Sequence, residues 1–257
     1  MKSKQPLTVL ITGATGAIGS ALAKAYAAPG VTLILQGRNR NNLMALSSAC
    51  EAAGALVYHH ELDVRDIAAQ KEWILRIDEQ TPLDLVIANA GMNINIGPDG
   101  AGESWEEVDM LLDTNLRSTM ALAHAVLPGM RERGKGQIAF MSSLAAYFGL
   151  PVTPSYCASK AALKSYGEAL RGWLAPEGIK VNVIMPGYVE SPMCQNMPGP
   201  KPFLLTPEKA AQIIQHGLEK NKPRISFPFP LNLGTWLLSV SHPAVAQRIL
   251  SWMNYHA

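Results

Sequence analysis

A tyrosine and a lysine four residues apart, Tyr156 and Lys160 in the segment SYCASK, are the residues of this 257-residue chain that first suggest chemistry. Residues four apart on a helix lie on one face. A phenol with a pKa of about 10 is a poor base at neutral pH, and a neighbouring ammonium group lowers that pKa. The pair is expected to exchange protons with a substrate. The same spacing is also common in helices where both side chains only pack.

Two further polar residues are candidates for the same site. Ser143 ends the apolar run GQIAFMSS, which predicts a strand leading into the helix of Tyr156. Its hydroxyl is expected to hydrogen-bond a substrate carbonyl oxygen, and the spacing to the tyrosine selects it over Ser142. Asn115, in LLDTNLRS, belongs to another predicted helix, and we expect it to hold a structured water behind Lys160.

The elements that position these residues alternate along the chain. Helical patterns near 17–28, 40–53, 66–79, 103–130 and 154–174 each follow an apolar run, namely LTVLI, VTLILQG, ALVYHH, LDLVIANAG and GQIAFMSS. IKVNVIMPG follows the last of these helices, and residues 224–227 are the candidate for the last strand. Continuous apolar strands followed by helices predict a mostly parallel sheet, here seven-stranded, with helices on both faces. The prediction is a single α/β domain over 1–257, doubly wound and Rossmann-type, with its ligand at the carboxyl ends of the strands.

The segment ITGATGAIGS lies between the first predicted strand and helix. Gly13 permits a tight turn, Gly16 allows a phosphate to approach the backbone, and Gly19 lets helix and strand pack closely. Thr15 adds a hydroxyl. The pattern predicts a dinucleotide pyrophosphate at the helix N-terminus, although glycines after a strand also occur in simple turns.

The second predicted strand ends at Gly37, where an NAD-specific site would carry a carboxylate for the ribose 2′-hydroxyl, and Arg38 follows. Without the carboxylate nothing repels a 2′-phosphate, and a guanidinium binds one by paired hydrogen bonds. We therefore expect NADP(H) in preference to NAD(H). The alternative is a solvated loop arginine.

These residues resemble the short-chain dehydrogenase/reductase family, in its branch of about 250 residues. The resemblance covers residues 7–193 and rests on TGATGAIG, LDV at 62–64, NAG at 89–91, TN at 114–115, SS at 142–143, YCASK at 156–160 and PG at 186–187. It implies a catalytic tetrad of Asn115, Ser143, Tyr156 and Lys160. The expected cofactor-binding residues are Gly13, Thr15, Gly16, Ala17, Ile18, Gly19, Arg38, Asp63, Val64, Asn89, Ala90, Gly91, Tyr156, Lys160, Pro186, Gly187, Val189 and Ser191.

The resemblance implies reversible hydride transfer between NADP(H) and a carbonyl or secondary alcohol, with Tyr156 as acid and base and Lys160 holding the ribose hydroxyls. Ser191 stands where relatives more often have threonine. The Gly-x-x-Gly-x-x-Gly spacing, with Ala17 in the middle position of the 250-residue pattern, resembles the longer epimerase branch instead. Length, NAG and YCASK favour the shorter branch. A sugar-modifying, epimerase-like enzyme and a non-catalytic NADP(H)-binding sensor or scaffold are the alternatives.

The C-terminal third departs most from the family pattern. Residues 190–220 are expected to form a substrate lid, in which Met193 and Met197 either contact an apolar or mixed substrate or only pack on the body. Residues 229–257 are predicted to form two short helices divided by Pro243. Their apolar stripes are Leu233, Trp236, Leu237 and Val240, then Val245, Ile249 and Trp252. They are expected to cover the substrate pocket or a subunit surface. The alternative is peripheral membrane contact, because Lys220, Lys222, Arg224 and Arg248 accompany the tryptophans.

Composition excludes several classes of function. A net charge of +2 gives no reason to expect a nucleic-acid partner. Three cysteines and six histidines show no metal-ligand spacing, so no metal site is expected and a reduced, cytoplasmic setting is favoured. Neither a signal peptide nor a membrane-spanning run is expected. In relatives the helices near 103–130 and 154–174 pair across a two-fold axis, which implies a homodimer, with the family's tetramer as the alternative.

Overall fold

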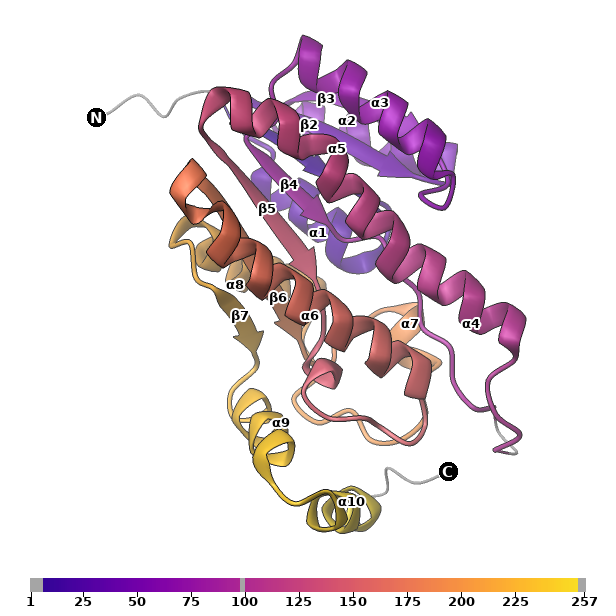
Figure 1. The fold of residues 1–257 in the computed structure, drawn as a ribbon. Helices are drawn as coiled ribbons and strands as arrows, with labels where there is room; N and C mark the ends of the chain where they lie inside the picture. Colours follow the sequence, from indigo (N-terminus) through magenta and orange to yellow (C-terminus); the bar gives the residue numbers. More distant parts are fainter. Residues whose placement is uncertain (1–6, 98–99, 254–257) are drawn as a thin grey trace.

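The computed structural model describes residues 7–97 and 100–253, and its centre is a seven-stranded sheet in the order β3-β2-β1-β4-β5-β6-β7 (Figure 1). Every strand pair is parallel, which confirms the predicted doubly wound sheet. The strands are β1 (Leu7–Ile11), β2 (Val31–Gly37), β3 (Leu56–Glu61), β4 (Leu85–Ala88), β5 (Gly136–Met141), β6 (Ile179–Pro186) and β7 (Arg224–Phe227).

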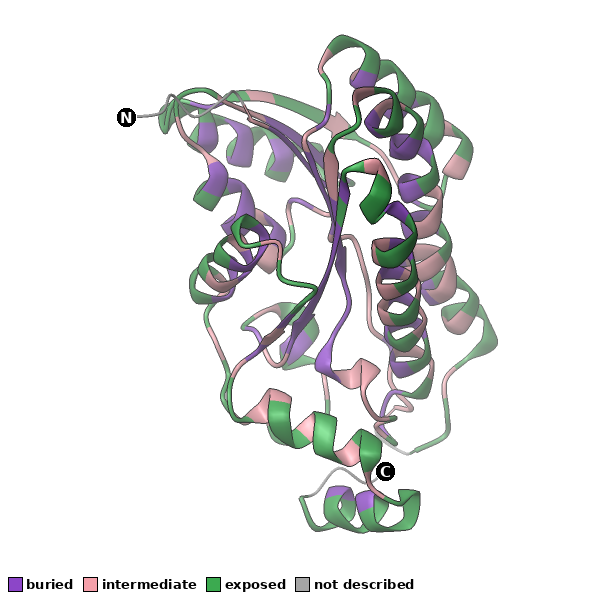
Figure 2. Cartoon of the chain, turned by 60° about the vertical axis from the view of Figure 1, so that its left-hand side comes forward, coloured by how far each residue is buried: buried purple, intermediate pink, exposed green. Residues whose placement is uncertain are grey.

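Helices cover both faces of the sheet (Figure 2). Side chains alternate along β1: Val9 and Ile11 join the apolar cluster under α1, α2 and α8, whereas Leu10 joins the cluster under α3, α5 and α6. The helices are α1 (Ala17–Tyr26), α2 (Arg40–Ala52), α3 (Ile67–Gln80), α4 (Trp105–Leu112), α5 (Ser118–Arg133), α6 (Pro154–Leu174), α7 (Pro192–Gln195), α8 (Pro207–Glu219), α9 (Leu231–Val240) and α10 (Pro243–Trp252).

The strand order reverses between β1 and β4, because the chain moves outward to β3 and then returns to the other side of β1. In open parallel sheets a ligand binds at this point, outside the carboxyl ends of the strands. The loops after β1, β4 and β5 all meet at this edge.

One predicted helix is divided in the structure. The stretch 103–130 forms α4, a π-helical turn over Asp113–Arg117, and α5. In the turn the amide of Ser118 bonds to Asp113 O, five residues back. The widened turn contains Asn115, and the apolar periodicity did not reveal it, because one extra residue in a turn leaves the helical pattern on either side intact. Such insertions are frequent at functional sites.

The C-terminal third also differs in part from expectation. Of the segment 190–220, the second half forms α8, which packs beside α1 on one face of the sheet. The tail forms two helices, and Pro243 is the first residue of the second. Residues 254–257 of the predicted extension lie outside the described residues.

Helix α6 lies unusually close to the sheet because Gly167 faces it. A Cβ at Gly167 would lie 2.7 Å from Cγ2 of Val183 and 3.0 Å from Cδ2 of Phe140. This close approach sets how far the first turns of α6, with Tyr156 and Lys160, project at the carboxyl edge.

We predict that Gly167→Ala lowers the free energy of unfolding by about 1–3 kcal/mol, because the added methyl overpacks the helix–sheet contact. Gly172→Ala is the matched control. A Cβ there meets no atom within 4 Å, so the better helix propensity of alanine is expected to leave stability unchanged or raise it by up to about 1 kcal/mol. Denaturant unfolding measures both. Equal effects at the two positions would contradict the close-packing role.

Candidate active site

The glycine loop after β1 has three glycines in three different environments. Gly13 has a φ of +61°, and a Cβ on it would lie 2.8 Å from Ala90 Cα. A Cβ on Gly19 would overlap Gly13 O. A Cβ on Gly16 would have only Gly13 O within 4 Å, at 3.4 Å, so the protein leaves free space beside Gly16. Gly16 is the N-cap of α1, and the first free amides of the helix follow it, where an anion is favoured; its own amide donates to Gly13 O at 3.1 Å.

Buried polar side chains hold this loop in place. Asn89 Nδ2 donates to Thr12 O and Gly13 O, both at 3.0 Å. The hydroxyl oxygen of Thr12 accepts from the amides of Asn89 and Ala90. Gly13 N donates to Gln36 Oε1 at 3.0 Å. Thr12 and Gln36 were not predicted, and the available signal was a polar residue at the end of an otherwise apolar strand.

The end of β2 is built without room for a carboxylate. A Cβ on Gly37 would lie 3.2 Å from both the methyl and the hydroxyl of Thr15. Arg38 is exposed and lines the cavity together with Asp63. Asp63 pairs with Arg65 at 2.6 Å, and the hydrogen bond from that guanidinium lowers the pKa of the carboxyl group. Asp63 is therefore ionised at neutral pH.

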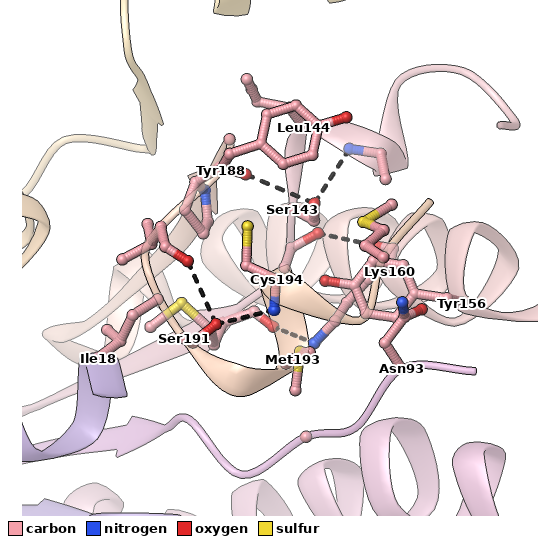
Figure 3. A pocket seen from close by; sticks show the side chains of 18 of the residues that line it. Ile18, Asn93, Ser143, Leu144, Tyr156, Lys160, Tyr188, Ser191, Met193 and Cys194 are labelled. Atoms are coloured by element: carbon pink, nitrogen blue, oxygen red, sulfur yellow. Dashed lines mark hydrogen bonds between the residues drawn. The ribbon is translucent and has the colours of Figure 1, made fainter. Parts of the chain in front are cut away.

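Three of the four predicted tetrad residues meet where β5 ends and α6 begins (Figure 3). Lys160 Nζ donates to Met141 O at 2.8 Å and lies 5.5 Å from the ring centroid of Tyr156. Ser143 Oγ donates to Pro186 O at 3.5 Å and accepts from Ala145 N at 3.1 Å, and the serine hydroxyl lowers the pKa of Tyr156. Ser142 turns the other way and donates to Lys160 O at 2.7 Å. The two neighbouring serines therefore have different hydrogen-bond partners.

Burial is the main cause of the pKa shifts of Tyr156 and Lys160. It raises the pKa of Tyr156 to about 12, against a smaller lowering by the hydrogen bond with Ser143. Burial also lowers the pKa of Lys160 to about 8. The expected lowering of the tyrosine pKa by the lysine is absent here, because the ammonium group is itself desolvated and directed at Met141 O. Tyr156 is consequently neutral at pH 7.

Asn115 is buried in the π-helical turn and does not line the cavity. Its Oδ1 accepts from Met92 N at 2.8 Å, and its Nδ2 donates to Met92 O and to Ser159 Oγ. Both amide protons are thereby used, so the side chain is not free to donate to the expected water. These bonds tie the segment after β4 to α6.

The first turn of α6 is also tied to the segment after β4. Thr153 Oγ1 donates to Ile94 O at 2.6 Å. The carboxylate of Glu103 accepts from the amide and the hydroxyl of Ser155, next to Tyr156. An acidic group at a helix N-terminus is favourable. These contacts were not predicted, because they join residues about fifty positions apart.

The loop after β6 carries the last predicted cofactor residues. Pro186 ends the strand, Val189 is buried, and Ser191 Oγ accepts from Cys194 N at 3.0 Å to cap α7. The hydroxyl of Ser191 donates to Val189 O. Serine therefore supplies the capping oxygen at a position where relatives more often have threonine.

One cavity of about 950 Å³ connects these parts. It is lined by all the predicted cofactor residues and by Ser143, while Asn115 lies behind it. The lining residues outside the predicted tetrad, cofactor set, lid and tail include Gln36, Asn39, Met92, Asn93, Thr114, Met141, Ser142, Leu144, Phe148, Leu150 and Tyr188.

The lid and tail segments contribute to the same cavity only in part. Met193 and Met197 line it, whereas Phe203 and Leu204 are exposed. In α9 the predicted apolar stripe is not buried: Val240 is 63% exposed, and Trp252 of α10 is 86% exposed. The tail therefore turns one face to the cavity and another apolar face outward.

Within the described ranges 7–97 and 100–253, the His, Cys, Asp and Glu side chains form no metal-binding cluster. None of the helices in those ranges is long and apolar enough to span a membrane. The three cysteines are buried and unpaired by disulfides.

The doubly wound sheet and its glycine loop define a dinucleotide-binding protein, and comparisons with known proteins identify its family. The pattern described as "short chain dehydrogenase" matches residues 7–201. An uncharacterised oxidoreductase of Myxococcus xanthus is 38% identical over 235 residues, which cover 91% of this chain and 92% of that protein. Ketoacyl reductase HetN of Nostoc is 30% identical over 257 residues, with 96% and 89% covered.

The fold agrees with this relationship. A short-chain dehydrogenase from Sphingobium yanoikuyae, solved in complex with NADPH, superposes with a TM-score of 0.80 at 24% identity and covers 95% of each chain. The chain belongs to the short-chain dehydrogenase/reductase family, whose members are oxidoreductases that bind NAD(P)(H).

We predict that Lys160→Met stabilises the protein at pH 7 by about 1–3 kcal/mol, because it removes a buried charge. The pKa of Lys160 is lower in the folded chain than its ordinary value of 10.5, so the unfolded chain binds this proton more tightly. The stability of the unmodified protein therefore rises relative to the variant between pH 8 and 10.5. Denaturant unfolding of both proteins at pH 7 and pH 10 tests this. A stability difference that is independent of pH would contradict it.

Proposed function

We propose that this protein catalyses the NADP(H)-dependent, reversible reduction of a carbonyl group to a secondary alcohol. The observation that carries the proposal is the convergence of the Ser143 and Tyr156 hydroxyls with the Lys160 amine on one cavity. That cavity continues to the glycine loop.

The residues present fit a phosphorylated dinucleotide. The space left at Gly16, the amides at the start of α1 and the exposed guanidinium of Arg38 form a cradle for anionic groups. Asp63 and Val64 would hold the adenine end, and Pro186 and Val189 would border the nicotinamide. The bound nicotinamide would supply or take up the hydride.

The chain's own residues would manage the proton and the developing charge. Tyr156 donates its proton to the carbonyl oxygen during reduction and takes it back during oxidation. Ser143 donates a hydrogen bond to the same oxygen and so polarises the carbonyl. Lys160 would hold the ribose hydroxyls of the bound nucleotide. Asn115 acts by fixing the segment after β4 against α6.

The names of relatives support a reductase. A putative ketoacyl reductase of the monensin polyketide synthase, from Streptomyces virginiae, is 36% identical over 192 residues, or 73% of this chain and 72% of that protein. HetN also carries the name ketoacyl reductase, and the Sphingobium structure holds NADPH. A 3-oxoacyl compound is therefore the first substrate class to test.

We propose a homodimer in the cytoplasm, formed through the helical layer of α4, α5 and α6. Trp105 and Trp173 are 72% and 58% exposed on this layer, as expected for side chains that a second copy would cover. Light scattering distinguishes dimer, tetramer and monomer.

The alternative role of the tail is contact with a membrane surface, because α9 and α10 turn an apolar face outward. Flotation with liposomes tests this alternative.

We predict that Tyr156→Phe binds NADPH as the unmodified protein does but reduces carbonyl compounds at least about a hundredfold more slowly, because the proton donor is lost while the ring remains. NADPH fluorescence measures binding, and loss of absorbance at the nicotinamide band measures turnover. Undiminished turnover would refute the acid–base role. Absence of turnover in both proteins across a carbonyl panel would favour the sensor or scaffold alternative.

We predict that Arg38→Ala weakens NADPH binding by about tenfold or more and leaves NADH binding within about twofold, because only NADPH carries the 2′-phosphate. Arg40→Ala is the matched control, since Arg40 is exposed nearby but does not line the cavity. Titration of both nucleotides against the three proteins gives the ratios. Equal losses for NADPH and NADH would mean that Arg38 is a solvated loop residue.

A further inference from the structure

The cavity continues beyond the reacting group, along the carboxyl edge of the sheet. Arg38 follows β2 and Asp63 follows β3, at one end of the strand order, while the tail follows β7 at the other end. Lys160 lies between them. We call the part beyond Lys160 the distal arm; its walls are the loop after β5, helix α7, and helices α9 and α10.

Charge is distributed unequally along this cavity. Among the described residues that line it, the charged ones are Arg38, Asp63 and Lys160. The distal arm contains none of them, so it offers no opposite charge to a carboxylate or a phosphate. Its apolar lining comes from three separate segments: Leu144, Phe148 and Leu150; Met193 and Met197; and Leu231, Leu237, Leu238, Ile249, Leu250 and Met253.

Two hydroxyl residues line the arm from α9, Thr235 and Ser241, and both donate their protons within the helix. Thr235 Oγ1 donates to Leu231 O at 3.1 Å, and Ser241 Oγ donates to Leu237 O at 2.7 Å. Each hydroxyl proton is therefore used within its own helix. A sugar in the arm would lose hydrogen bonds to water without finding donors on this wall, which is unfavourable.

We propose that the distal arm binds an uncharged, unbranched alkyl chain attached to the carbonyl group that is reduced. The inference rests on the proposed function and names its substrate class. An alkyl chain needs no hydrogen-bond partner and gains free energy from every methylene that leaves water. Helices α9 and α10 form the outer wall over that chain.

Gly234 provides a direct test of the arm. It lines the cavity from α9, and a Cβ built on it meets no atom within 4 Å. The first atom of a larger side chain there would therefore lie in open space at the cavity wall. Glycine is also a poor helix former, so substitution is not expected to unfold α9.

The experiment measures kcat/KM with NADPH for straight-chain 2-alkanones from four to ten carbons. In the unmodified protein we expect a rise of up to about fourfold per added methylene until the arm is filled. Gly234→Phe is expected to reduce the value for 2-decanone by tenfold or more and to leave 2-butanone within about twofold.

Two control variants separate filling of the arm from effects on the helix. Gly234→Ala changes helix propensity with little added volume. Ser239→Phe adds the same ring to α9 at an exposed residue that does not line the cavity. Both are expected to keep the chain-length dependence. A flat dependence in the unmodified protein, or an equal loss for all ketones in Gly234→Phe, would overturn the proposal.

A second readout does not require turnover. With NADP⁺ present, 2-decanol is expected to raise the melting temperature more than 2-butanol at the same concentration, and Gly234→Phe is expected to abolish the difference. If no ketone is reduced but this difference appears, the proposed reaction fails and the alkyl site stands. If ketones are reduced but neither chain length nor Gly234→Phe matters, the reaction stands and the alkyl site fails.

Discussion

The packing of α6 on the end of β5 is the constraint on which the site depends. Gly167 brings the helix against the sheet, Lys160 Nζ bonds to Met141 O, and Ser142 bonds back to Lys160 O. Together these contacts set the register between strand and helix, and that register places Ser143 opposite Tyr156. The desolvation that accompanies the close packing raises the pKa of the tyrosine and lowers that of the lysine. The close packing of α6 on β5 therefore determines both where Tyr156 and Lys160 lie and how their pKa values are shifted.

The glycine-loop half of the cavity is held together differently. Hydrogen bonds to the side chains of Asn89, Thr12 and Gln36 fix the loop, and Ala14 packs into the apolar cluster. The two tail helices form the outer wall of the distal half, and α9 has no buried residue. The two halves therefore differ in how closely their walls are tied to the sheet, as expected where one reaction centre is combined with a variable substrate wall.

The sequence predicted the fold and the nucleotide loop well because both follow from local patterns. The strand at 224–227 and the helix at 154–174 were predicted with the bounds that the structure has, and Pro243 marked the division of the tail. The π-helical turn at Asn115 escaped prediction because it leaves the apolar pattern unchanged. The pairing of Glu103 with Ser155 escaped because it joins segments distant in sequence, whereas the lid and the tail were expected at the substrate pocket and do line the distal arm. The tyrosine pKa was predicted in the wrong direction, since burial cannot be read from the spacing of two residues.

The central claim is that α6 and β5 present a carbonyl group to the reduced nucleotide. Transfer of label from NADPH deuterated at the nicotinamide C4 position tests it most directly, with the alcohol product analysed by mass spectrometry. The account predicts one deuterium on the carbinol carbon of every product molecule when the transferring position is labelled. An alcohol formed without deuterium, whichever C4 position is labelled, would contradict it.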